Sequence, residues 1–433
     1  MTESPSRKAT ATGGRGATAR HIPPTLALAV GRPACPAPAG WQWRALDELA
    51  KMESGHTPSR RHPEYWGGTI PWISIRDAKA NHGREIHDTL EKTNEHGIAN
   101  SSARVLPAGT VCLSRTASVG YVVVTSKPMA TSQDFVNWIC SEGLEPRFLQ
   151  YLLLAEGRNL LRFASGAVHQ TIYFPEAKAF CVCVPSRSEQ IRLITLLDEA
   201  FASIAKARAN AEKKLQNARE IFESYLQSVF ATRGEGWLEK RLDEISTFSS
   251  GGTPSKTNVG YWNGDIPWVS GRDMKSTRLS DSFLHISRSA VDESATRLVP
   301  AGTLLVLVRG MGLVHGAQIA ELMVPCAFNQ DIKGIHVDPS VIPRYLLFAL
   351  GNRINSSDSV LSNAAHGTLK IDSAELRKLT VPVPDIEDQQ KAVSTIDLLA
   401  EETQRLESIY QKKLAALDEL KQSLLHQAFR GKL

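Results

Sequence analysis

The sequence of 433 residues has little cysteine and no long apolar run. Its six cysteines include no Cys-x-x-Cys pair, which argues against a disulfide scaffold and a structural zinc site and favours a reducing cytoplasm. No apolar stretch approaches the ~18 residues that a membrane-spanning helix needs, so we expect the bulk of the chain to be soluble. A hydrophobic content of 42% is enough for real cores and excludes a disordered or fibrous chain.

Familiar catalytic and cofactor motifs are also lacking. No Gly-x-Gly-x-x-Gly, P-loop, His-Glu-x-x-His or Gly-x-Ser-x-Gly string has the required spacing, and no Asn/Asp-Pro-Pro-aromatic string of adenine methyltransferases occurs. Cys181 and Cys183 lie in a predicted buried strand, so we do not expect them to bind a metal. The absences predict a recognition subunit without bound cofactor or metal, which directs chemistry done by other subunits.

The net charge of +5 indicates no partner. Residues 1–39 hold five Arg or Lys against one acid, and the remaining 45 bases and 44 acids nearly balance. Any basic surface must therefore come from local placement. The same 39 residues are rich in Pro, Gly, Ala, Ser and Thr, and their only apolar run is shorter than a secretory core usually is. They predict a disordered extension or a misassigned start, with a processed targeting peptide as the alternative.

An internal repeat organises the rest of the chain. Residues 54–79 align without gaps on residues 250–275, with 15 identical positions among 26. The register continues forward through Pro-Ala-Gly-Thr at Pro107 and Pro300, and it reaches Lys-Lys-Leu at Lys213 and Lys412. The protein is therefore one module written twice.

Each copy is predicted to be a mixed, mainly β module followed by a long helix, which makes the fold class α+β. Turn sequences stand beside short β-rich runs, and after the closing Val-Pro no proline occurs for about 45 residues. The predicted organisation is an extension over 1–39, a first module over 40–187 with a helix over 188–233, and a second module over 236–385 with a helix over 386–430.

The two long helices carry apolar stripes with coiled-coil spacing. At about 1.5 Å per residue each would be about 60 Å long, and a stripe of that length needs a partner. We predict that the two helices pair antiparallel as a coiled coil, with Arg208 and Thr403 as polar residues in the stripes. The alternative is that each helix packs on its own module.

Two copies of a recognition module held apart by a spacer can bind two features at a fixed distance on a long, regular polymer, and double-stranded DNA is the natural candidate. The target would be bipartite, with an unread gap. If the modules read different sequences, positions identical in both should build the scaffold or contact phosphate, whereas differing polar positions should contact bases.

The shared class contains tryptophans and tyrosines, which we interpret as core, and a Gly-x-Thr-Pro-Ser turn, whose hydroxyls are more typical of local capping than of phosphate contact. The predicted candidates for phosphate contact are Ser54, Thr57, Ser59, Arg76, Ser250, Thr253, Ser255 and Arg272.

The differing class aligns Arg84 with Ser280 and the loop 115–118 with residues 309–315. Arg and Lys can pair with guanine, and Asn and Gln with adenine, in the major groove, although for any one of these side chains a solvated surface group is the favoured interpretation. The candidates for base contact, including the shared glutamines as weaker ones, are Arg60, Arg61, His62, Arg84, Arg115, Thr116, Ser118, Gln133, His169, Lys256, Thr257, Asn258, Arg309, His315, Gln330 and His366.

The duplicated Ser-Gly-x-Thr-Pro-Ser, Tyr-Trp, Ile-Pro-Trp and Arg-Asp strings, each followed by Val-Pro and a long helix, resemble the specificity subunit of type I restriction-modification systems over residues 40–433. The resemblance implies two target-recognition domains, one for each half-site. It also implies two methyltransferase subunits that use S-adenosylmethionine, and a restriction subunit that uses ATP with Mg²⁺. Residues before Gly40 are not part of that pattern.

Two interpretations from other classes remain open. One is an autonomous methyltransferase or nuclease, against which the missing motifs argue. The other is a structural adaptor whose modules bind proteins instead of DNA.

Overall fold

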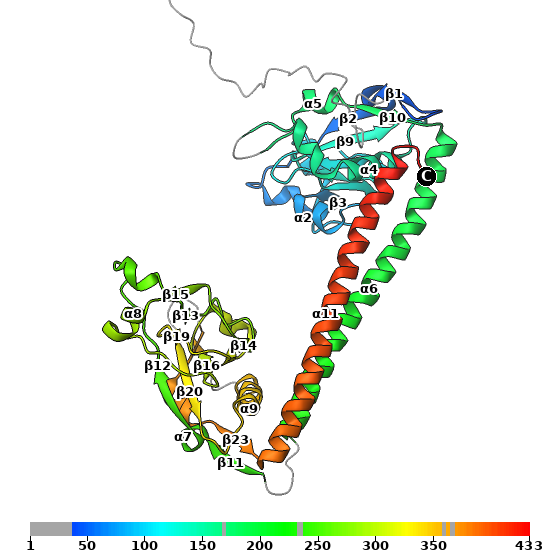
Figure 1. The fold of residues 1–433 in the computed structure, drawn as a ribbon. Helices are drawn as coiled ribbons and strands as arrows, with labels where there is room; N and C mark the ends of the chain where they lie inside the picture. Colours follow the sequence, from blue (N-terminus) through cyan, green and yellow to red (C-terminus); the bar gives the residue numbers. More distant parts are fainter. Residues whose placement is uncertain (1–36, 167–169, 232–236, 357–360, 364–368) are drawn as a thin grey trace, which may run out of the picture. The chain divides into compact units, whose positions relative to one another are not determined.

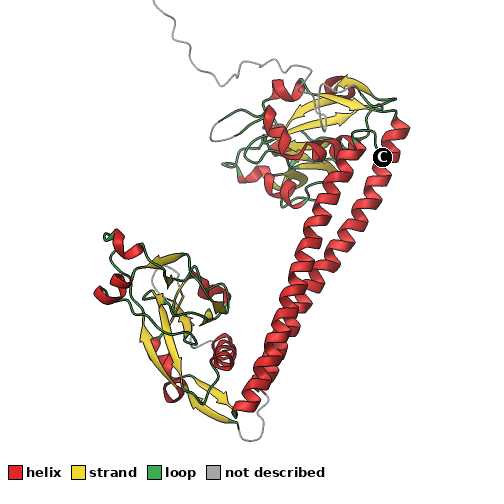
Figure 2. Cartoon of the chain, viewed as in Figure 1, coloured by secondary structure: helices red, strands yellow, loops and turns green. Residues whose placement is uncertain are grey.

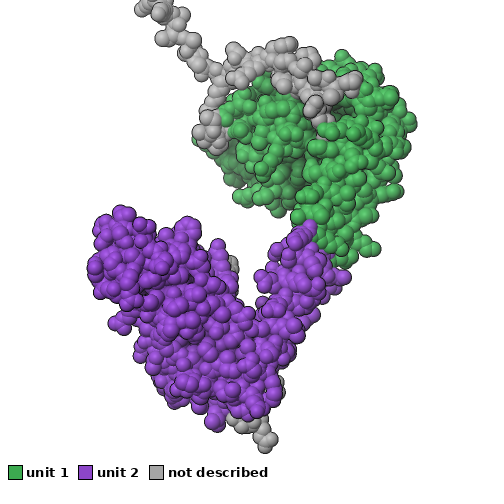
Figure 3. Space-filling view, in the orientation of Figure 1, with its two compact units in different colours: residues 1–210, 413–433 green, residues 211–412 purple. Residues whose placement is uncertain are grey.

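The structure is a computed structural model that describes residues 37–166, 170–231, 237–356, 361–363 and 369–433. The chain divides into two compact units, one of residues 1–210 with 413–433 and one of residues 211–412 (Figure 3). Both boundaries fall inside the long helices. Each unit therefore contains one module and parts of both helices.

The first module is built of short strands joined by short helices and turns (Figure 2). Its elements in chain order are β1 Gln42–Ala45, α1 Leu46–Leu49, β2 Ala50–Ser54, η2 Pro63–Tyr65, β3 Trp66–Ile73, α2 Ile75–Ala80, β4 Glu85–Ile86, β5 Glu91–Thr93, α3 Glu95–Ala99, β6 Val111–Ser114, β7 Val122–Thr125, β8 Ala130–Thr131, β9 Phe135–Cys140, α4 Pro146–Glu156, η3 Gly157–Phe163, α5 Phe174–Lys178 and β10 Cys181–Val184.

Its largest sheet has five strands in the order β2-β9-β6-β7-β4. Two of its three interior strands, β6 and β7, consist mostly of apolar residues and are buried along their whole length. A strand that is covered on both faces needs apolar side chains at consecutive positions, which explains why these runs do not alternate. A three-stranded sheet, β5-β3-β8, and the pair β1-β10 complete the module.

The second module repeats most of this series of elements. In chain order they are β11 Leu238–Arg241, α7 Leu242–Ile245, β12 Ser246–Ser250, η4 Val259–Trp262, β13 Ile266–Val269, β14 Arg278–Leu279, β15 Leu284–Ile286, α8 Arg288–Glu293, β16 Leu304–Leu307, β17 Arg309–Gly310, η5 Met311–His315, β18 Ile319–Leu322, β19 Ala327–Phe328, β20 Ile332–Val337, α9 Pro343–Asn355, β21 Leu361–Asn363, β22 Leu369–Ile371, α10 Ser373–Lys378 and β23 Thr380–Val383.

The strand orders of the two modules match. The second module has the five-stranded sheet β12-β20-β16-β18-β14, the three-stranded sheet β15-β13-β19 and the pair β11-β23. It also has a small sheet, β17-β22-β21. The predicted α+β fold with two repeated, mainly β modules is therefore confirmed.

The shared Pro-Ala-Gly-Thr turn leads into a central strand in each module. Gly109 and Gly302 both have φ of 80°, a left-handed conformation that favours glycine. The hydroxyl of the following threonine donates to the proline carbonyl, at 2.7 Å in the first module and 2.8 Å in the second. Each turn is thus closed by its own side chain.

Two long helices follow the modules, α6 Arg187–Ala231 and α11 Ile386–Ala428 (Figure 1). They lie where the stripes predicted helices. The predicted stripe residues are all buried or partly buried, and they are Leu193, Leu197, Phe201, Ile204, Arg208, Ala211, Leu215, Ala218, Phe222, Tyr225 and Val229 in α6 and Leu399, Leu406, Tyr410, Leu414, Leu417 and Leu424 in α11.

The helices pair antiparallel within each unit, as predicted. In the first unit Arg208 donates to Asp418 at 2.6 Å, and the Lys421 ammonium lies 5.0 Å from the Phe201 ring centroid. In the second unit Arg219 donates to Glu407 at 2.5 Å. Residues later in α6 therefore meet residues earlier in α11.

The ends of the helices pack on the modules. The core of the first module includes Leu193 and Leu197 from the start of α6, Leu425 and Ala428 from the end of α11, and Phe429 directly after it. The core of the second module includes Val393 and Ile396 from the start of α11, and Phe222, Leu226 and Phe230 from the end of α6 pack against it. The alternative that each helix packs on its own module is thus right for the first turns only.

A buried glutamine fixes the start of each long helix. The Gln190 amide oxygen accepts from the Glu145 backbone at 2.9 Å, and its nitrogen donates to the Gly143 and Pro185 carbonyls. Gln389 makes the same set of bonds in the second unit, to Ile342, Ser340 and Pro384. Both side chains are fully buried, so each must satisfy all its polar atoms within the protein.

We expect apolar packing to dominate the attachment of α11 to the first module. Phe429 is buried and lies 5.1 Å from the Phe148 ring, so Phe429→Ala should lower the free energy of unfolding of the first unit by about 3 kcal/mol. Arg208→Ala removes a partly exposed ion pair and should cost less than about 1 kcal/mol. Scanning calorimetry and native-state hydrogen exchange measure both, and equal costs would contradict this ranking.

Candidate nucleic-acid interface

A surface hollow in the first module brings several predicted residues together. It lies where β3, the start of α2, the segment before β5 and the segment after β8 converge. Candidates for both base contact and phosphate contact line it. The lining residues are Thr57, Arg60, Trp72, Ser74, Ile75, Arg76, Leu90, Glu91, Ser132, Gln133 and Asp134.

The shared threonine and glutamine are bonded to each other in both modules. The Thr57 hydroxyl donates to the Gln133 amide oxygen, and the Thr253 hydroxyl donates to that of Gln330 at 2.6 Å. Both glutamines are exposed. Because the oxygen is engaged, the amide nitrogen is the group that each glutamine offers to a ligand.

Close packing explains the glycine of the Gly-x-Thr-Pro-Ser turn. A Cβ at Gly55 would lie 1.9 Å from the Ser132 carbonyl oxygen, and one at Gly251 would lie 2.3 Å from that of Phe328. Any side chain there would displace the turn from the strand beside it. The glycine thus holds the threonine within reach of its glutamine.

The tryptophans form a repeated pair beneath the turn. Trp72 and Trp268 are buried, and their indole nitrogens donate to the carbonyls of His56 and Gly252 at 3.1 and 3.0 Å. Trp66 and Trp262 are half-buried and meet the first two edge to face, with centroids 5.1 and 5.0 Å apart. The prediction that these rings belong to the core holds for the first pair, whereas the second pair is only partly buried.

The shared aspartate organises the segment after Ile-Pro-Trp. Asp77 is buried and accepts from the Ser74 backbone at 2.9 Å, the Ser74 hydroxyl at 2.6 Å and the Leu90 backbone at 2.8 Å. Asp273 accepts the equivalent three bonds in the second module. These aspartates therefore build the scaffold, as positions identical in both modules were expected to do.

The phosphate candidates fall into two groups. Arg76 and Arg272 are exposed, and the latter stacks on Phe283 at 4.7 Å. The serines have local roles: Ser54 pairs with Val136 in a sheet, Ser59 accepts from the Arg61 backbone, Ser250 accepts from Lys333, and Ser255 bonds to Thr257. The two arginines are thus the members with a charge open to solvent.

Arg60 is held more firmly than a solvated side chain. Its guanidinium makes a bidentate ion pair with the Glu91 carboxylate, and its Cζ lies 3.9 Å from the Trp66 ring centroid. The Arg60 guanidinium lowers the pKa of the Glu91 carboxyl, and the carboxylate in turn raises the pKa of Arg60. Its neighbour Arg61 is exposed, and His62 bonds to Glu64 at 2.8 Å and stacks on Tyr65.

Arg84 lies apart from the hollow, next to the long helix α11. Burial and the nearby Arg84 and Arg208 guanidinium groups lower the pKa of Lys421. The alignment of Arg84 with Ser280 was wrong, because the strand pairing in the two sheets makes Thr277 the counterpart of Arg84. Their carbonyls accept from equivalent positions, the backbones of Val124 and Glu321. The second module is three residues shorter here, which the gapless alignment did not allow for.

The loop after β6 is tied to its own module. Arg115 is half-buried, donates to the Gln133 carbonyl at 3.0 Å and stacks on Phe174 at 4.3 Å. Burial lowers the pKa of Arg115. Thr116 bonds to Thr171 at 2.7 Å, and Ser118 is exposed. Of these predicted base readers, Ser118 is the one whose side chain faces solvent most freely.

The candidates of the second module are mostly exposed. Lys256, Thr257 and Asn258 lie in the turn before η4, where the Asn258 side chain caps the Gly260 backbone at 3.1 Å. Arg309 is exposed in β17. His315 ends η5, but its side chain lies outside the described residues, as do His169 and His366 entirely.

Glu91 is a charged lining residue that sequence reasoning missed. It lies beyond the gapless part of the repeat, and its counterpart is visible only through strand register. Trp72 pairs with Glu91 across β3 and β5, and Trp268 pairs with Leu284 across β13 and β15. The signal that could have revealed Glu91 is the difference between Glu91 and Leu284 at equivalent positions of the two modules. Only an alignment with a gap brings these two residues together.

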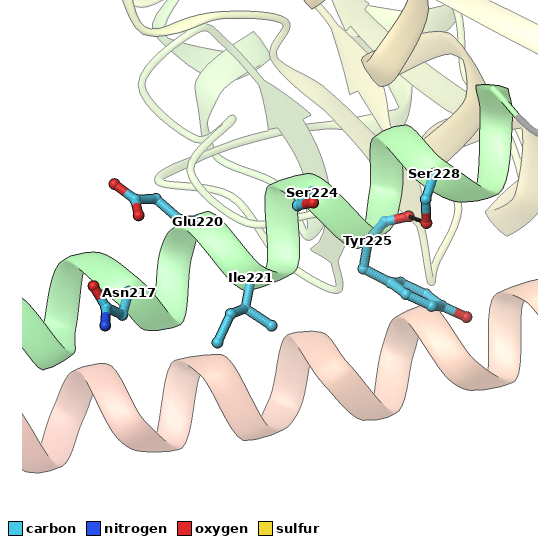
Figure 4. A pocket seen from close by; sticks show the side chains of 6 residues that line it. All are labelled: Asn217, Glu220, Ile221, Ser224, Tyr225 and Ser228. Atoms are coloured by element: carbon cyan, nitrogen blue, oxygen red, sulfur yellow. Dashed lines mark hydrogen bonds between the residues drawn. The ribbon is translucent and has the colours of Figure 1, made fainter.

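The second unit also has a shallow hollow on one face of α6 (Figure 4). Ile221 and Tyr225 extend from α6 on the side of α11, whereas Glu220 extends away from it. Ile221 is 65% exposed, and Leu420, at the equivalent position of α11, is 47% exposed. Both helices therefore present an apolar side chain to solvent at the same point of the repeat.

Over the described ranges, no group of three or more His, Cys, Asp or Glu side chains is arranged to hold a metal ion. Within the same residues, no helix has the length and apolar content needed to cross a membrane.

Burial raises the pKa of Cys183 to about 11, so this thiol stays protonated at neutral pH.

Comparison with known proteins gives one consistent family. Residues 38–213 and 234–414 both match the family described as "Type I restriction modification DNA specificity domain". The chain is 31% identical over 249 residues to the type I restriction enzyme EcoR124I/EcoR124II specificity subunit of Escherichia coli, covering 56% of this chain and 59% of that one. It is 26% identical over 248 residues to the MjaIX specificity subunit of Methanocaldococcus jannaschii, covering 54% and 57%. These matches span just over half the length of the curated relatives.

Solved structures share the fold. One, described as "Structural basis underlying complex assembly and conformational transition of the type I R-M system", has a TM-score of 0.75 at 18% identity and covers 92% of this chain and 100% of its own. The crystal structure of the HsdS subunit from Thermoanaerobacter tengcongensis has a TM-score of 0.57 at 18% identity, with 92% and 99% covered.

If Asp77 builds the scaffold, its loss should be costly. Asp77→Ala leaves three buried or partly buried donors without their acceptor, and we expect it to lower the free energy of unfolding of the first unit by about 2–3 kcal/mol. Asp88→Ala, which removes an exposed carboxylate, is the matched control and should leave the unfolding temperature unchanged. Thermal unfolding followed by circular dichroism makes the comparison, and similar behaviour of the two variants would rule out the scaffold role.

Proposed function

The chain belongs to the type I restriction-modification DNA specificity family, and from this premise we propose that it is the DNA-specificity subunit of a type I restriction-modification complex. In this role it recognises a bipartite double-stranded DNA site with an unread gap. It directs partner methyltransferase subunits, and restriction subunits where they exist, to that site.

The observation that carries this proposal is the separation of shared from differing side chains. The Thr–Gln pair, the edge-to-face tryptophans and the aspartate that accepts three hydrogen bonds recur in both modules. The polar residues around them differ, as Arg60 and Lys256 illustrate. One scaffold with two sets of surface groups is what a reader of two different half-sites needs.

Recognition would divide between two kinds of contact. Exposed side chains of the differing class, such as Arg60, Arg61, Ser118, Lys256 and Arg309, would enter the major groove and contact base edges. Arg76 and Arg272 would contact phosphate and orient the protein on the duplex without reading sequence. The paired helices would set the length of the gap.

Chemistry would belong to the partners. Adenine methylation would take place on two docked methyltransferase subunits that use S-adenosylmethionine and flip the target base, and a restriction subunit would use ATP with Mg²⁺. The exposed Ile221 and Leu420, at equivalent points of the two helices, support two equivalent docking surfaces. The chain itself would be non-catalytic and would act in the cytoplasm.

Two assays separate this function from the alternatives. An autonomous enzyme would transfer methyl groups or cut DNA as the purified chain alone, and we expect no activity above background. An adaptor without DNA specificity would give a complex with no sequence preference. Footprinting of the assembled complex should instead protect two separated patches.

Replacement of one module should change one half-site. If residues 41–185 are exchanged for the corresponding module of another specificity subunit, we expect a new sequence in one half of the target and the original sequence in the other, because each module carries its own reading side chains. Single-molecule sequencing of methylated adenines shows both halves at once. A change in both halves would refute independent readers.

Loss of a phosphate contact should weaken binding to all sequences alike. The affinity for DNA decreases as salt concentration rises, so a plot of log affinity against log salt concentration has a negative slope. For Arg76→Gln and Arg272→Gln we expect this slope to become less steep by about 0.9 each, since one fewer counterion is released. Arg44→Gln is the control, because the partly exposed Arg44 of β1 bonds to Glu48 of the following helix α1. Titrations of specific and unrelated duplexes at several salt concentrations test this, and a loss confined to one base pair would assign base reading instead.

A further inference from the structure

The guanidinium of Arg60 is fixed on three sides. Its two terminal nitrogens donate to the two oxygens of Glu91 at 2.5 and 2.7 Å. Its Cζ lies 3.9 Å from the centroid of the Trp66 ring and 5.1 Å from that of Trp72. The carboxylate sets the direction of the group, and the indole ring sets its plane.

This arrangement leaves hydrogen-bonding capacity on an exposed side chain. Of the five N–H groups of a guanidinium, the ion pair uses two, so three are left for other acceptors. The side chain of Arg60 is 50% exposed and lines the hollow beside Thr57 and Gln133. Two parallel N–H groups on one edge match the O6 and N7 acceptors of guanine in the major groove.

The ion pair contributes little to holding the fold together. The side chain of Glu91 is 47% exposed and that of Arg60 is half exposed, and pairs of this kind add at most about 1 kcal/mol in proteins generally. The surrounding hollow already has its own structural bonds, between Thr57 and Gln133 and between Asp77 and Leu90. A contribution to folding stability therefore does not by itself account for the contacts of Glu91 and Trp66 that fix the Arg60 guanidinium.

The comparison of the two modules within this chain gives independent support. Lys256 takes the place of Arg60, and Leu284 takes the place of Glu91, since Trp72 faces Glu91 and Trp268 faces Leu284 across the same strands. The residues around them, the Thr–Gln pair and both tryptophans, are unchanged. The arginine and its carboxylate are thus both present in one module and both absent from the other, which is the pattern of a single unit within the differing class.

We propose that Arg60 reads a guanine in the half-site recognised by the first module, and that Glu91 is the positioning residue that holds its guanidinium for this contact. The inference rests on the proposed function and deepens it. It assigns one base of one half-site to one side chain and adds a second residue that determines specificity without touching DNA. It also implies that the second module, with Lys256 and Leu284, reads its corresponding position differently.

The test uses this chain assembled with its methyltransferase subunits. After the methylated target has been identified, each base pair of both half-sites is varied in turn, and methylation rates are measured for the wild-type protein and for Glu91→Gln. We expect discrimination at one G·C pair of one half-site to fall by about 10- to 100-fold, because the bidentate contact loses its orientation. Arg60→Lys should weaken discrimination at the same pair, and the other half-site serves as the internal control.

Two further measurements keep the result decisive. Asp88→Asn removes an exposed carboxylate that pairs with Lys92 and Lys127 and should leave discrimination unchanged. The unfolding temperature of Glu91→Gln should stay close to that of the wild type, which excludes a general loss of fold.

Unchanged discrimination in Glu91→Gln, or an equal loss at every position of both half-sites, would overturn the assignment. Failure of the proposed function gives a different result, because the wild-type complex would then show no bipartite preference at all.

Discussion

The apolar stripes of the two long helices are the constraint on which the architecture depends. A helix of 45 residues with one apolar face is not stable alone in water, so the face must be covered along its length. It is covered by the helix's own module at its start, by the antiparallel partner helix in the middle and by the other module at its end. Because residues 413–433 complete the core of the first module, that core is built from two separate stretches of chain, whereas the second unit is the continuous stretch 211–412.

Duplication makes the pairing of the helices self-consistent. The Lys-Lys-Leu strings at Lys213 and Lys412 align the two helices, and in this alignment Arg208 corresponds to Glu407 and Arg219 to Asp418. The ion pairs join Arg208 with Asp418 and Arg219 with Glu407. Each pair is thus the counterpart of the other with the charges exchanged. Two copies of one helix that pair antiparallel make every contact twice, so one set of complementary positions serves both units.

The modules keep scaffold and surface separate. Both copies use the same scaffold contacts: glycines packed against neighbouring carbonyls, buried tryptophans, and aspartates that accept hydrogen bonds from backbone N–H groups. None of these contacts depends on the groups that face solvent around the hollow. The second module can therefore have Lys256 and Leu284 at the positions equivalent to Arg60 and Glu91 and still keep the same fold. For a protein proposed to read variable DNA sequences, this independence lets specificity change while the assembly stays the same.

The sequence by itself determined the duplication, the α+β class, the two long helices and their antiparallel pairing, because periodicity and turn chemistry are local and a repeat multiplies their signal. It also placed Trp72, Trp268 and Asp77 in the scaffold correctly. Only the tertiary structure decided that Glu91 faces Arg60, that Arg84 lies by Lys421, that Arg115 is bound to its own module and that the helix ends complete the cores. The physical reason is strand register: side chains far apart in sequence meet across a ladder whose offset changes with every gap, and no local pattern encodes that offset.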